Sequence, residues 1–370
     1  MAPPFSIVAL DRDHLDELIA NAFILGGLNC NLNRIDVSKI EDFSGLFKDT
    51  YFTGDVSQWN TSSAKTMESM FCNSFFTSDI SKWNTSNVKT MASMFANSKF
   101  NSTISGWDVS NVTNMRGIFQ SSIFNLDLSQ WNISLVENMD GMFAYSKFSG
   151  VVSEWDTRSV KSMNAMFQDT TDFISDISKW NVSRLESLAG LFWGSSFNGD
   201  ISQWDTSNVR NMRRAFYRSK FNGNLSNWNT SRVTNMERMF SGTSFLGNIE
   251  RWDVSNVKNM SFLFEGTQYH RNLSNWSVQP GTSLEGFFRN APNALLAQTM
   301  RPWVVSLFLD SGTVPSDPVW ASAFEEVAPI AKGLMLDIQS HAQAIVSLVN
   351  IPTAGENYDF DYDAFTPSNK

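Results

Sequence analysis

Hydrophobic and polar positions alternate along this chain in a pattern that repeats every 24 residues. Each unit reads roughly I-S-x-W-[ND]-x-S-x-V-x-x-M-x-x-M-F-x-x-S-x-F-x-x-x, and tryptophan marks the period most clearly. The ten tryptophans of the series are Trp59, Trp83, Trp107, Trp131, Trp155, Trp180, Trp204, Trp228, Trp252 and Trp276. One step is 25 residues long, with the extra residue near Thr170–Asp172, and Ile35 stands where an eleventh tryptophan is expected. A fixed period of this length is typical of stacked repeats, so the chain is predicted to be a repeat solenoid of eleven coils.

The other hydrophobic columns indicate how one coil is built. An aliphatic residue precedes each tryptophan by three positions, a methionine or leucine follows it by eight, and a phenylalanine follows it by twelve. The Ile-Ser-x-Trp segment is short and β-prone, which predicts one short strand per coil. The three-residue spacing of V-x-x-M-x-x-M-F predicts one short helical or 3₁₀ turn. A single unit cannot bury these side chains, so we expect each to pack on its copy in the next coil, in a leucine-rich-repeat-like β-solenoid.

Both ends of the array depart from the repeat. The segment Asp11–Gly26 opens with acidic residues and carries an apolar stripe, which predicts an N-terminal capping helix within residues 1–27. The eleven coils are assigned to residues 28–290. Residues 291–350 have no 24-residue period and predict a C-terminal α-helical region, which either caps the last coil or forms a docking module. Residues 351–370 alternate acids with aromatics, as a solvated tail or a short recognition segment would.

Composition narrows the classes of partner. The formal net charge of −9 disfavours nucleic acid and anionic lipid, because their phosphates would be repelled. Two cysteines and three scattered histidines offer neither a disulfide framework nor a ligand spacing, so no cofactor and no metal are expected. The sequence has no long apolar run and no standard secretory signal, so we expect no membrane insertion. We expect the protein to be extracellular, on the cell surface or secreted by a route without a signal peptide. A cytoplasmic location is the alternative.

The chain carries no recognised catalytic motif. It lacks GxSxG, a phosphate-binding Walker loop and a dinucleotide fingerprint, so it is predicted not to be an enzyme. Carboxylates recur at Asp55, Asp79, Asp176 and Asp200, and close carboxylates can support glycoside hydrolysis, but nothing distinguishes one pair. The Asn or Asp that follows the tryptophan in nine repeats, from Asn60 to Asp253, is interpreted as a turn residue that hydrogen-bonds its own backbone. A calcium ladder is the alternative there, although the glycine-rich calcium-binding repeat is absent.

A binding face is expected where a column departs from its consensus. The residue before each tryptophan varies freely, as at Gln58 and Lys82. Variable residues on the strands line the concave side of leucine-rich solenoids, so this column is one candidate for the binding face. The column after the invariant phenylalanine holds Trp193 and Tyr217 in adjacent coils. The arginines near them are Arg210, Arg213, Arg214, Arg218, Arg232 and Arg238. Exposed aromatics beside arginines are typical interface anchors, so this cluster is the candidate binding site. Alternatively, the rings pack against their own coils and the arginines pair with nearby acids.

The repeat resembles that of a known family. The stretch from Trp83 to Trp107 is similar to the repeat of the BspA-like leucine-rich-repeat surface proteins, and Cys30–Phe47 resembles the segment that opens their array. This resemblance covers about residues 28–290 and implies a leucine-rich-repeat-like solenoid without enzymatic activity. It also implies binding of a protein, such as a host or surface receptor. The printed sequence shows no signal peptide or lipobox cysteine like those of the lipoprotein members, so anchoring by a lipid is not expected.

The predicted function is therefore a non-catalytic macromolecule-binding scaffold, an adhesin-like module for protein–protein interaction. A glycan is the other partner class considered. The alternatives are a secreted effector or virion-associated recognition protein that uses the same surface, and a carbohydrate-active enzyme.

Overall fold

The computed structural model describes residues 7–271, 273, 275–279 and 281–291. The chain divides into two units, Met1–Ser311 and Gly312–Lys370, and every described residue belongs to the first. The predicted helical region 291–350, apart from Ala291, and the tail 351–370 lie outside the described residues.

The N-terminal helix forms where the sequence predicts it. Helix α1 spans Arg12–Gly26, and the side chain of its N-cap residue Asp11 accepts a hydrogen bond from the backbone N–H of His14. Gly27 ends the helix with a φ of 72°, a left-handed conformation that glycine adopts without strain. Leu15 and Ile19 are buried, so one face of α1 packs on the repeat.

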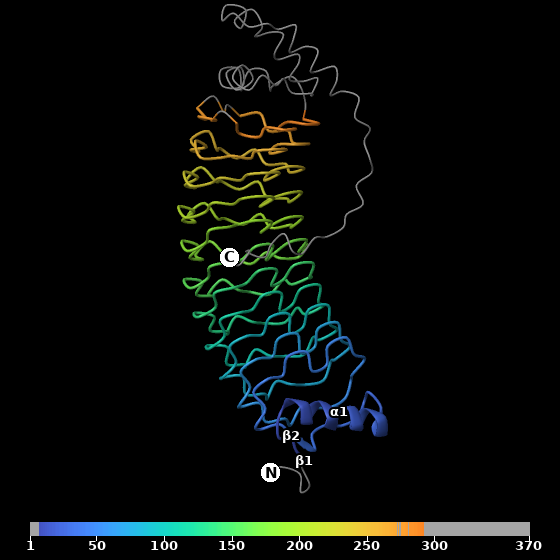
Figure 1. Ribbon diagram of the computed structural model, residues 1–370. Helices are drawn as coiled ribbons and strands as arrows, with labels where there is room; N and C mark the ends of the chain where they lie inside the picture. Colours follow the sequence, from blue (N-terminus) through green and yellow to red (C-terminus); the bar gives the residue numbers. More distant parts are fainter. Residues whose placement is uncertain (1–6, 272, 274, 280, 292–370) are drawn as a thin grey trace, which may run out of the picture. The chain divides into compact units, whose positions relative to one another are not determined.

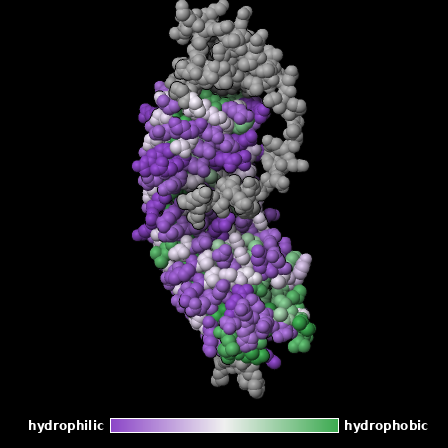
Figure 2. All heavy atoms as spheres, in the orientation of Figure 1, coloured by the Kyte–Doolittle hydropathy of each residue, from purple (hydrophilic) through white to green (hydrophobic). Residues whose placement is uncertain are grey.

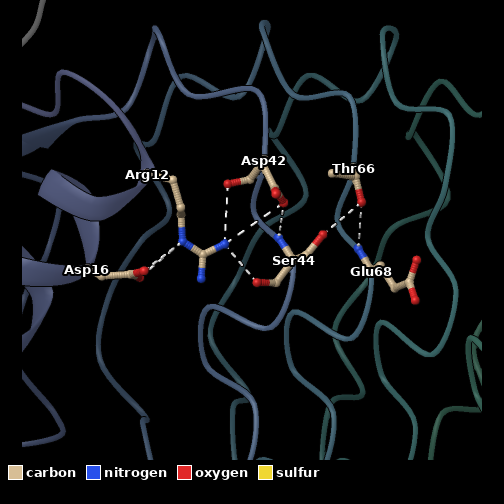
Figure 3. Close-up of polar contacts among 6 residues, drawn as sticks. All are labelled: Arg12, Asp16, Asp42, Ser44, Thr66 and Glu68. Carbon is tan, nitrogen blue, oxygen red and sulfur yellow. Dashed lines mark hydrogen bonds and ion pairs between the residues drawn. The ribbon is translucent and has the colours of Figure 1, made fainter.

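The helix and a short strand cover the first coil. Strand β1 (Ile7–Val8) pairs in parallel with β2 (Ile35–Asp36), which contains the residue that replaces the eleventh tryptophan. Arg12 on α1 donates from Nη1 to the backbone oxygens of Asp42 and Ser44, at 3.4 and 2.7 Å (Figure 3). Its Nε is ion-paired with Asp16. The guanidinium thus supplies donors to carbonyls that no preceding coil can reach.

From this start the chain folds into 24-residue coils, each stacked on the next (Figure 1). The repeated tryptophans, methionines and phenylalanines are buried, with the tryptophans 2–4% exposed. Like residues stack in register: the rings of Trp83 and Trp107 lie 6.5 Å apart and 2° from parallel, and those of Phe71 and Phe95 lie 5.7 Å apart and 2° from parallel. The predicted burial of each coil's apolar residues against their copies is confirmed, and the chain is a repeat protein.

The predicted strand of each coil is wrong. Ile-Ser-x-Trp is a tight turn, in which the N–H of Trp83 bonds the carbonyl of Ile80 at 3.1 Å. Apart from one bridge between Asn31 and Asp55, parallel pairing between coils occurs instead at the residue just before the methionine column, as in Thr66 with Thr90. The reason is that Ile80 and Trp83 must both point inward, three positions apart, which an extended strand with its period of two does not allow.

The predicted helical turn is also wrong, because half of the segment's N–H groups bond the next coil and only the others bond within the segment. We call the seven residues from the methionine column onward the ladder segment, represented by Met67–Asn73. Alternate N–H groups, beginning at Met67, bond carbonyls of the following coil at 2.8–3.0 Å. The N–H groups of Met70 and Cys72 bond carbonyls three residues back. Two residues per ladder segment, here Ser69 and Asn73, have a φ of 54°, which excludes a right-handed helix.

The tryptophan column adds a polar link between coils. Every one of the ten indole Nε1–H groups donates to the carbonyl of the aliphatic residue in the preceding coil, at 2.9–3.1 Å. Trp131, for example, donates to the oxygen of Ile104 at 3.1 Å. These bonds are buried, so each satisfies two groups that would otherwise be unpaired in the core.

The corners of the coils and much of their outer surface are polar (Figure 2). Nine of the ten tryptophans of the series are followed by Asn or Asp, whose side chain accepts a hydrogen bond from the N–H two residues on, as Asn84 does from Ser86 at 3.0 Å and Asp108 from Ser110 at 3.0 Å. The pKa of the Asp108 carboxyl is lowered by its hydrogen bonds with Ser110. The interpretation of this column as turn chemistry is confirmed.

Candidate partner-binding surface

The ladder segment Met67–Asn73 presents four side-chain positions on the outside of the stack, although in some other coils the residue at one of these positions, such as Ala144, is buried. In the segment Met67–Asn73, the two methionines and Phe71 point into the core, whereas Glu68, Ser69, Cys72 and Asn73 are at least partly exposed. Consecutive coils are joined here by backbone hydrogen bonds, so these positions form four straight columns along the surface. A partner that lies on this face would meet side chains from several coils at once.

The two left-handed positions of the ladder segment restrict which residues fit. Most coils place glycine, serine or asparagine there, such as Gly117, Gly141, Ser93 and Asn97. Three consecutive coils instead place large side chains at the first of the two positions. These are Arg214, Arg238 and Phe262, with φ between 54° and 58°. A residue other than glycine in this conformation costs roughly 1–3 kcal/mol, and such strain concentrates where side chains serve a function.

The large residues form what we call the aromatic–arginine strip. Its members are Trp193, Arg214, Tyr217, Arg218, Arg238, Phe262 and Arg289. The rings of Trp193 and Tyr217 meet edge to face, with centroids 5.4 Å apart. The guanidinium carbon of Arg214 lies 5.1 Å from the Trp193 ring centroid and 5.8 Å from that of Tyr217. Arg218 lies 5.0 Å from the Tyr217 centroid. Cations over aromatic faces are attracted by the ring quadrupole, which fixes both side chains.

The strip continues across the next coils around Phe262. Arg238 lies 4.3 Å from the Phe262 centroid, and Arg289 lies 5.4 Å from it. Glu265 is ion-paired with both arginines, at 3.2 Å to Arg238 and 4.0 Å to Arg289. Gly286 makes this packing possible, because a Cβ there would lie 2.4 Å from the Phe262 ring.

Charge is unevenly balanced along the strip. Arg213, on its border, is ion-paired with Glu237 at 3.2 Å, and Arg238 and Arg289 share Glu265. Among the described residues, Arg214 and Arg218 have no ion pair, and the buried Nε of Arg214 has no hydrogen-bond acceptor. Burial, followed by the neighbouring charge of Arg213, lowers the pKa of the Arg214 guanidinium. These two cations are therefore the charges of the strip without an ion pair to a described residue, although the carboxylates of Glu237 and Asp169 lie close enough to interact with Arg214 and Arg218 respectively.

The sequence-predicted site is only partly brought together. Trp193, Tyr217, Arg213, Arg214, Arg218 and Arg238 gather at the strip. Arg210 is exposed and lies outside it, with no ring contact or ion pair to a described residue, and Arg232 donates to Asn208 at 2.6 Å. Tyr217 is 5% exposed, so the expectation of an exposed anchor is wrong for this ring, whereas Trp193 is half-buried. Tyr217 is buried because the two arginines and Trp193 cover it.

The sequence reasoning missed Phe262, Glu265 and Arg289. Phe262 belongs to the column two residues after the first methionine, which also holds Arg214 and Arg238. Most residues in that column are glycine or serine, so a comparison along the column would have singled out Arg214, Arg238 and Phe262. Glu265 and Arg289 share the column of Trp193 and Tyr217, where their polar side chains do not stand out.

A family model described as Mycoplasma protein of unknown function, DUF285, matches residues 15–125, 120–220 and 194–303. Together the three tandem matches span well over half of the 370-residue chain. The chain belongs to this family. Neither the curated proteins nor the solved structures compared with the chain gave a match.

In this DUF285 chain, the variable residue before each tryptophan is expected to lie on a strand. The structure instead places it in the Ile-Ser-x-Trp turn. A shallow hollow at this edge is lined by polar residues of two adjacent coils, namely Asp55, Ser57, Gln58, Ser78, Asp79 and Lys82. The carboxylate of Asp79 accepts from the N–H of Ser81 at 2.8 Å, and hydrogen bonds with Ser81 lower its pKa. A lowered pKa keeps the carboxylate ionised at neutral pH and disfavours a role as a general acid.

The described part of this DUF285 chain has no group of three or more His, Cys, Asp or Glu residues arranged to hold a metal ion. None of its helices in the described residues is long and apolar enough to cross a membrane. Cys30 and Cys72 are free thiols, and burial raises the pKa of each.

Proposed function

We propose that the chain is a non-catalytic binding scaffold, a leucine-rich-repeat-like solenoid akin to the BspA-like surface proteins. In this proposal the aromatic–arginine strip contacts a protein partner. The observation that carries it is the placement of Arg214, Arg238 and Phe262 at left-handed positions in three consecutive coils. Other coils meet the same backbone requirement with glycine, alanine or serine, so folding alone does not explain these residues.

The composition of the strip favours a protein partner over other classes. Tryptophan, tyrosine, phenylalanine and arginine are enriched at the centres of protein interfaces. The rings are held by neighbouring guanidiniums, so they lose little conformational freedom on binding. The net charge of −9 disfavours nucleic acid as the ligand.

The test compares two double variants of the full chain as baits for partner proteins from candidate host surfaces, quantified by mass spectrometry. Trp193→Ala with Arg214→Ala removes the centre of the strip. Gln203→Ala with Arg210→Ala removes one side chain at the turn edge and one arginine outside the strip. We expect the first variant to reduce recovery of specific partners about tenfold or more, as loss of a hot spot does, and the second to leave recovery unchanged.

Thermal unfolding of both variants provides the folding control. Only a small shift is expected for the strip variant, because its side chains lie outside the core columns. If the strip variant loses both its partner and its folded structure, the assignment of Trp193 and Arg214 to the surface is refuted. Arg218→Glu, at an exposed residue, then tests partner binding by the strip without disturbing the fold. Equal recovery by both double variants at unchanged stability would refute the proposed function of the strip.

A further inference from the structure

Resting on the proposed function of the strip, we propose that Arg214, Tyr217 and Arg218 form a clamp for an acidic segment of the partner protein. In this clamp the two guanidiniums bind carboxylate side chains, and the rings of Trp193 and Tyr217 support them from below. The inference concerns the chemistry of the partner at one part of the strip, a stretch bearing closely spaced aspartates or glutamates.

The first argument is the charge balance of individual residues. Arg213, Arg238 and Arg289 each have a glutamate within 4.0 Å, so their charges are satisfied within the protein. Arg214 and Arg218 have none among the described residues, although Asp169 is close enough to Arg218 for its carboxyl to sense that charge. Glu237 likewise acts on Arg214 without forming an ion pair with it. Two adjacent cations without ion pairs, in a chain of net charge −9, create a local field that attracts an anion.

The second argument is that both guanidiniums are already positioned. Their carbons lie 5.8 and 5.0 Å from the centroid of the same Tyr217 ring, in one coil. A Cβ at Gly242 would lie 3.1 Å from Cγ of Arg218, so glycine in the next coil leaves room for the stem of that arginine. Arginine side chains held in place by stacking lose little entropy when they form hydrogen bonds.

The third argument concerns the spacing of the anions. In an extended peptide, side chains two residues apart lie on the same face and are about 7 Å apart. Guanidiniums that both stack against one ring can each meet one such carboxylate, and arginine binds carboxylates in a bidentate, charge-assisted manner. Phosphate polymers carry denser charge and would meet the glutamates at positions 237 and 265 beside the clamp, which favours discrete carboxylates over nucleic acid.

The experiment measures peptide binding to the purified full chain by calorimetry. The probe is a synthetic peptide in which aspartate alternates with serine, and its control has asparagine in place of every aspartate. We expect the aspartate peptide to bind and the asparagine peptide not to bind. Arg214→Gln and Arg218→Gln should each weaken binding about tenfold, and added salt should weaken it further, since both effects follow from charge-assisted contacts.

Arg210→Gln is the matched control, because it removes the same charge outside the strip and should leave peptide binding unchanged. Equal affinity for the two peptides, or equal weakening by Arg210→Gln, would overturn the clamp. Inorganic phosphate and a single-stranded oligonucleotide are also tested as competitors of the bound peptide. If either one displaces it at a lower concentration than unlabelled aspartate peptide does, the clamp is overturned. Since Arg218 is exposed, its variant tests the clamp even if Arg214→Gln perturbs folding.

The two proposals fail separately. If partner recovery depends on the strip but the aspartate peptide does not bind, the acidic clamp is wrong and the scaffold function stands. If the peptide binds but strip variants recover partners as the unmodified chain does, the clamp stands and the strip is not the main partner surface.

Discussion

At the scale of single residues, tryptophan is the side chain that joins each coil to the one before it. Its ring stacks on its counterpart, as phenylalanine also does in its own column. Only tryptophan adds a buried donor, which reaches a carbonyl 27 residues earlier in most coils and 28 earlier at Trp180, after the inserted residue. The indole therefore explains why this column holds tryptophan and the neighbouring columns hold phenylalanine.

The substitution Trp131→Phe tests this role. It keeps an aromatic ring but leaves the carbonyl of Ile104 without its donor, so the free energy of unfolding should fall by roughly 1–3 kcal/mol. The smaller ring adds a further loss through reduced packing. Urea denaturation followed by circular dichroism measures the change. Met139→Leu, which is equally buried and keeps its volume, should cost less than about 1.5 kcal/mol. Similar losses in the two variants would contradict a special role for the indole.

At the scale of the element, the ladder segment is regular although it is neither a strand nor a helix. Left-handed residues at two fixed positions turn the chain, and alternate N–H groups bond the next coil. The sequence predicts which side chains are buried, because Met91, Met94 and Phe95 fall in unmistakable columns. It does not predict the backbone conformation, because residues three positions apart face the core both in a helix and in this series of turns. Ser93 and Asn97 would be ordinary on a helix surface, and here both are left-handed.

The same ambiguity limits what the sequence says of the binding surface. Trp193 and Tyr217 stand out because their column elsewhere holds smaller or polar residues, such as Ala96 and Gln120. Phe262 does not stand out until its column is known to be left-handed. The ion pair between Arg213 and Glu237 depends on which side chains of adjacent coils face each other. A helical turn would point these side chains in other directions, so the sequence does not predict the pair.

The left-handed column gives a prediction for the backbone. Gly141 has a φ of 59°, and a Cβ there would contact nothing closer than 3.9 Å, so Gly141→Ala introduces strain without a clash. We expect a loss of about 1 kcal/mol in the free energy of unfolding. Gly106 lies in open space without a positive φ, so Gly106→Ala should be neutral or slightly stabilising. Chemical denaturation of the two variants, compared side by side, measures the difference. Equal stability would contradict the assigned left-handed backbone.

At the scale of the whole molecule, the contacts between coils always join positions at the same few separations. Backbone bonds connect residues such as Met67 with Thr90, and the indole bonds connect residues such as Trp83 with Val56. Each coil therefore meets its neighbours through the same set of bonds, and the strip occupies only the coils from Trp193 to Arg289. Stability is expected to be approximately additive over coils and the interfaces between them.

Deletion of one whole period tests this additivity. Removal of residues 107–130 joins Gly106 to Trp131 and places Ile104 three positions before a tryptophan, as in every other coil. We expect the shortened chain to keep its circular dichroism signature and its binding of the aspartate peptide, with a modest fall in stability. Removal of residues 107–118 alone should disrupt packing at the junction, because the shortened coil cannot place its columns in register with the coils on either side. Equivalent behaviour of the two deletions would contradict the repeat mechanism.

The direction of the indole bonds has a consequence for synthesis of the chain. Each tryptophan donates to a carbonyl that precedes it, so its acceptor has already been translated when the tryptophan leaves the ribosome. A coil can close against its predecessor without waiting for later sequence, and α1 with Arg12 provides the first template. The array is thus suited to grow coil by coil from its N-terminus, and a translational pause late in the message would leave the completed coils already packed.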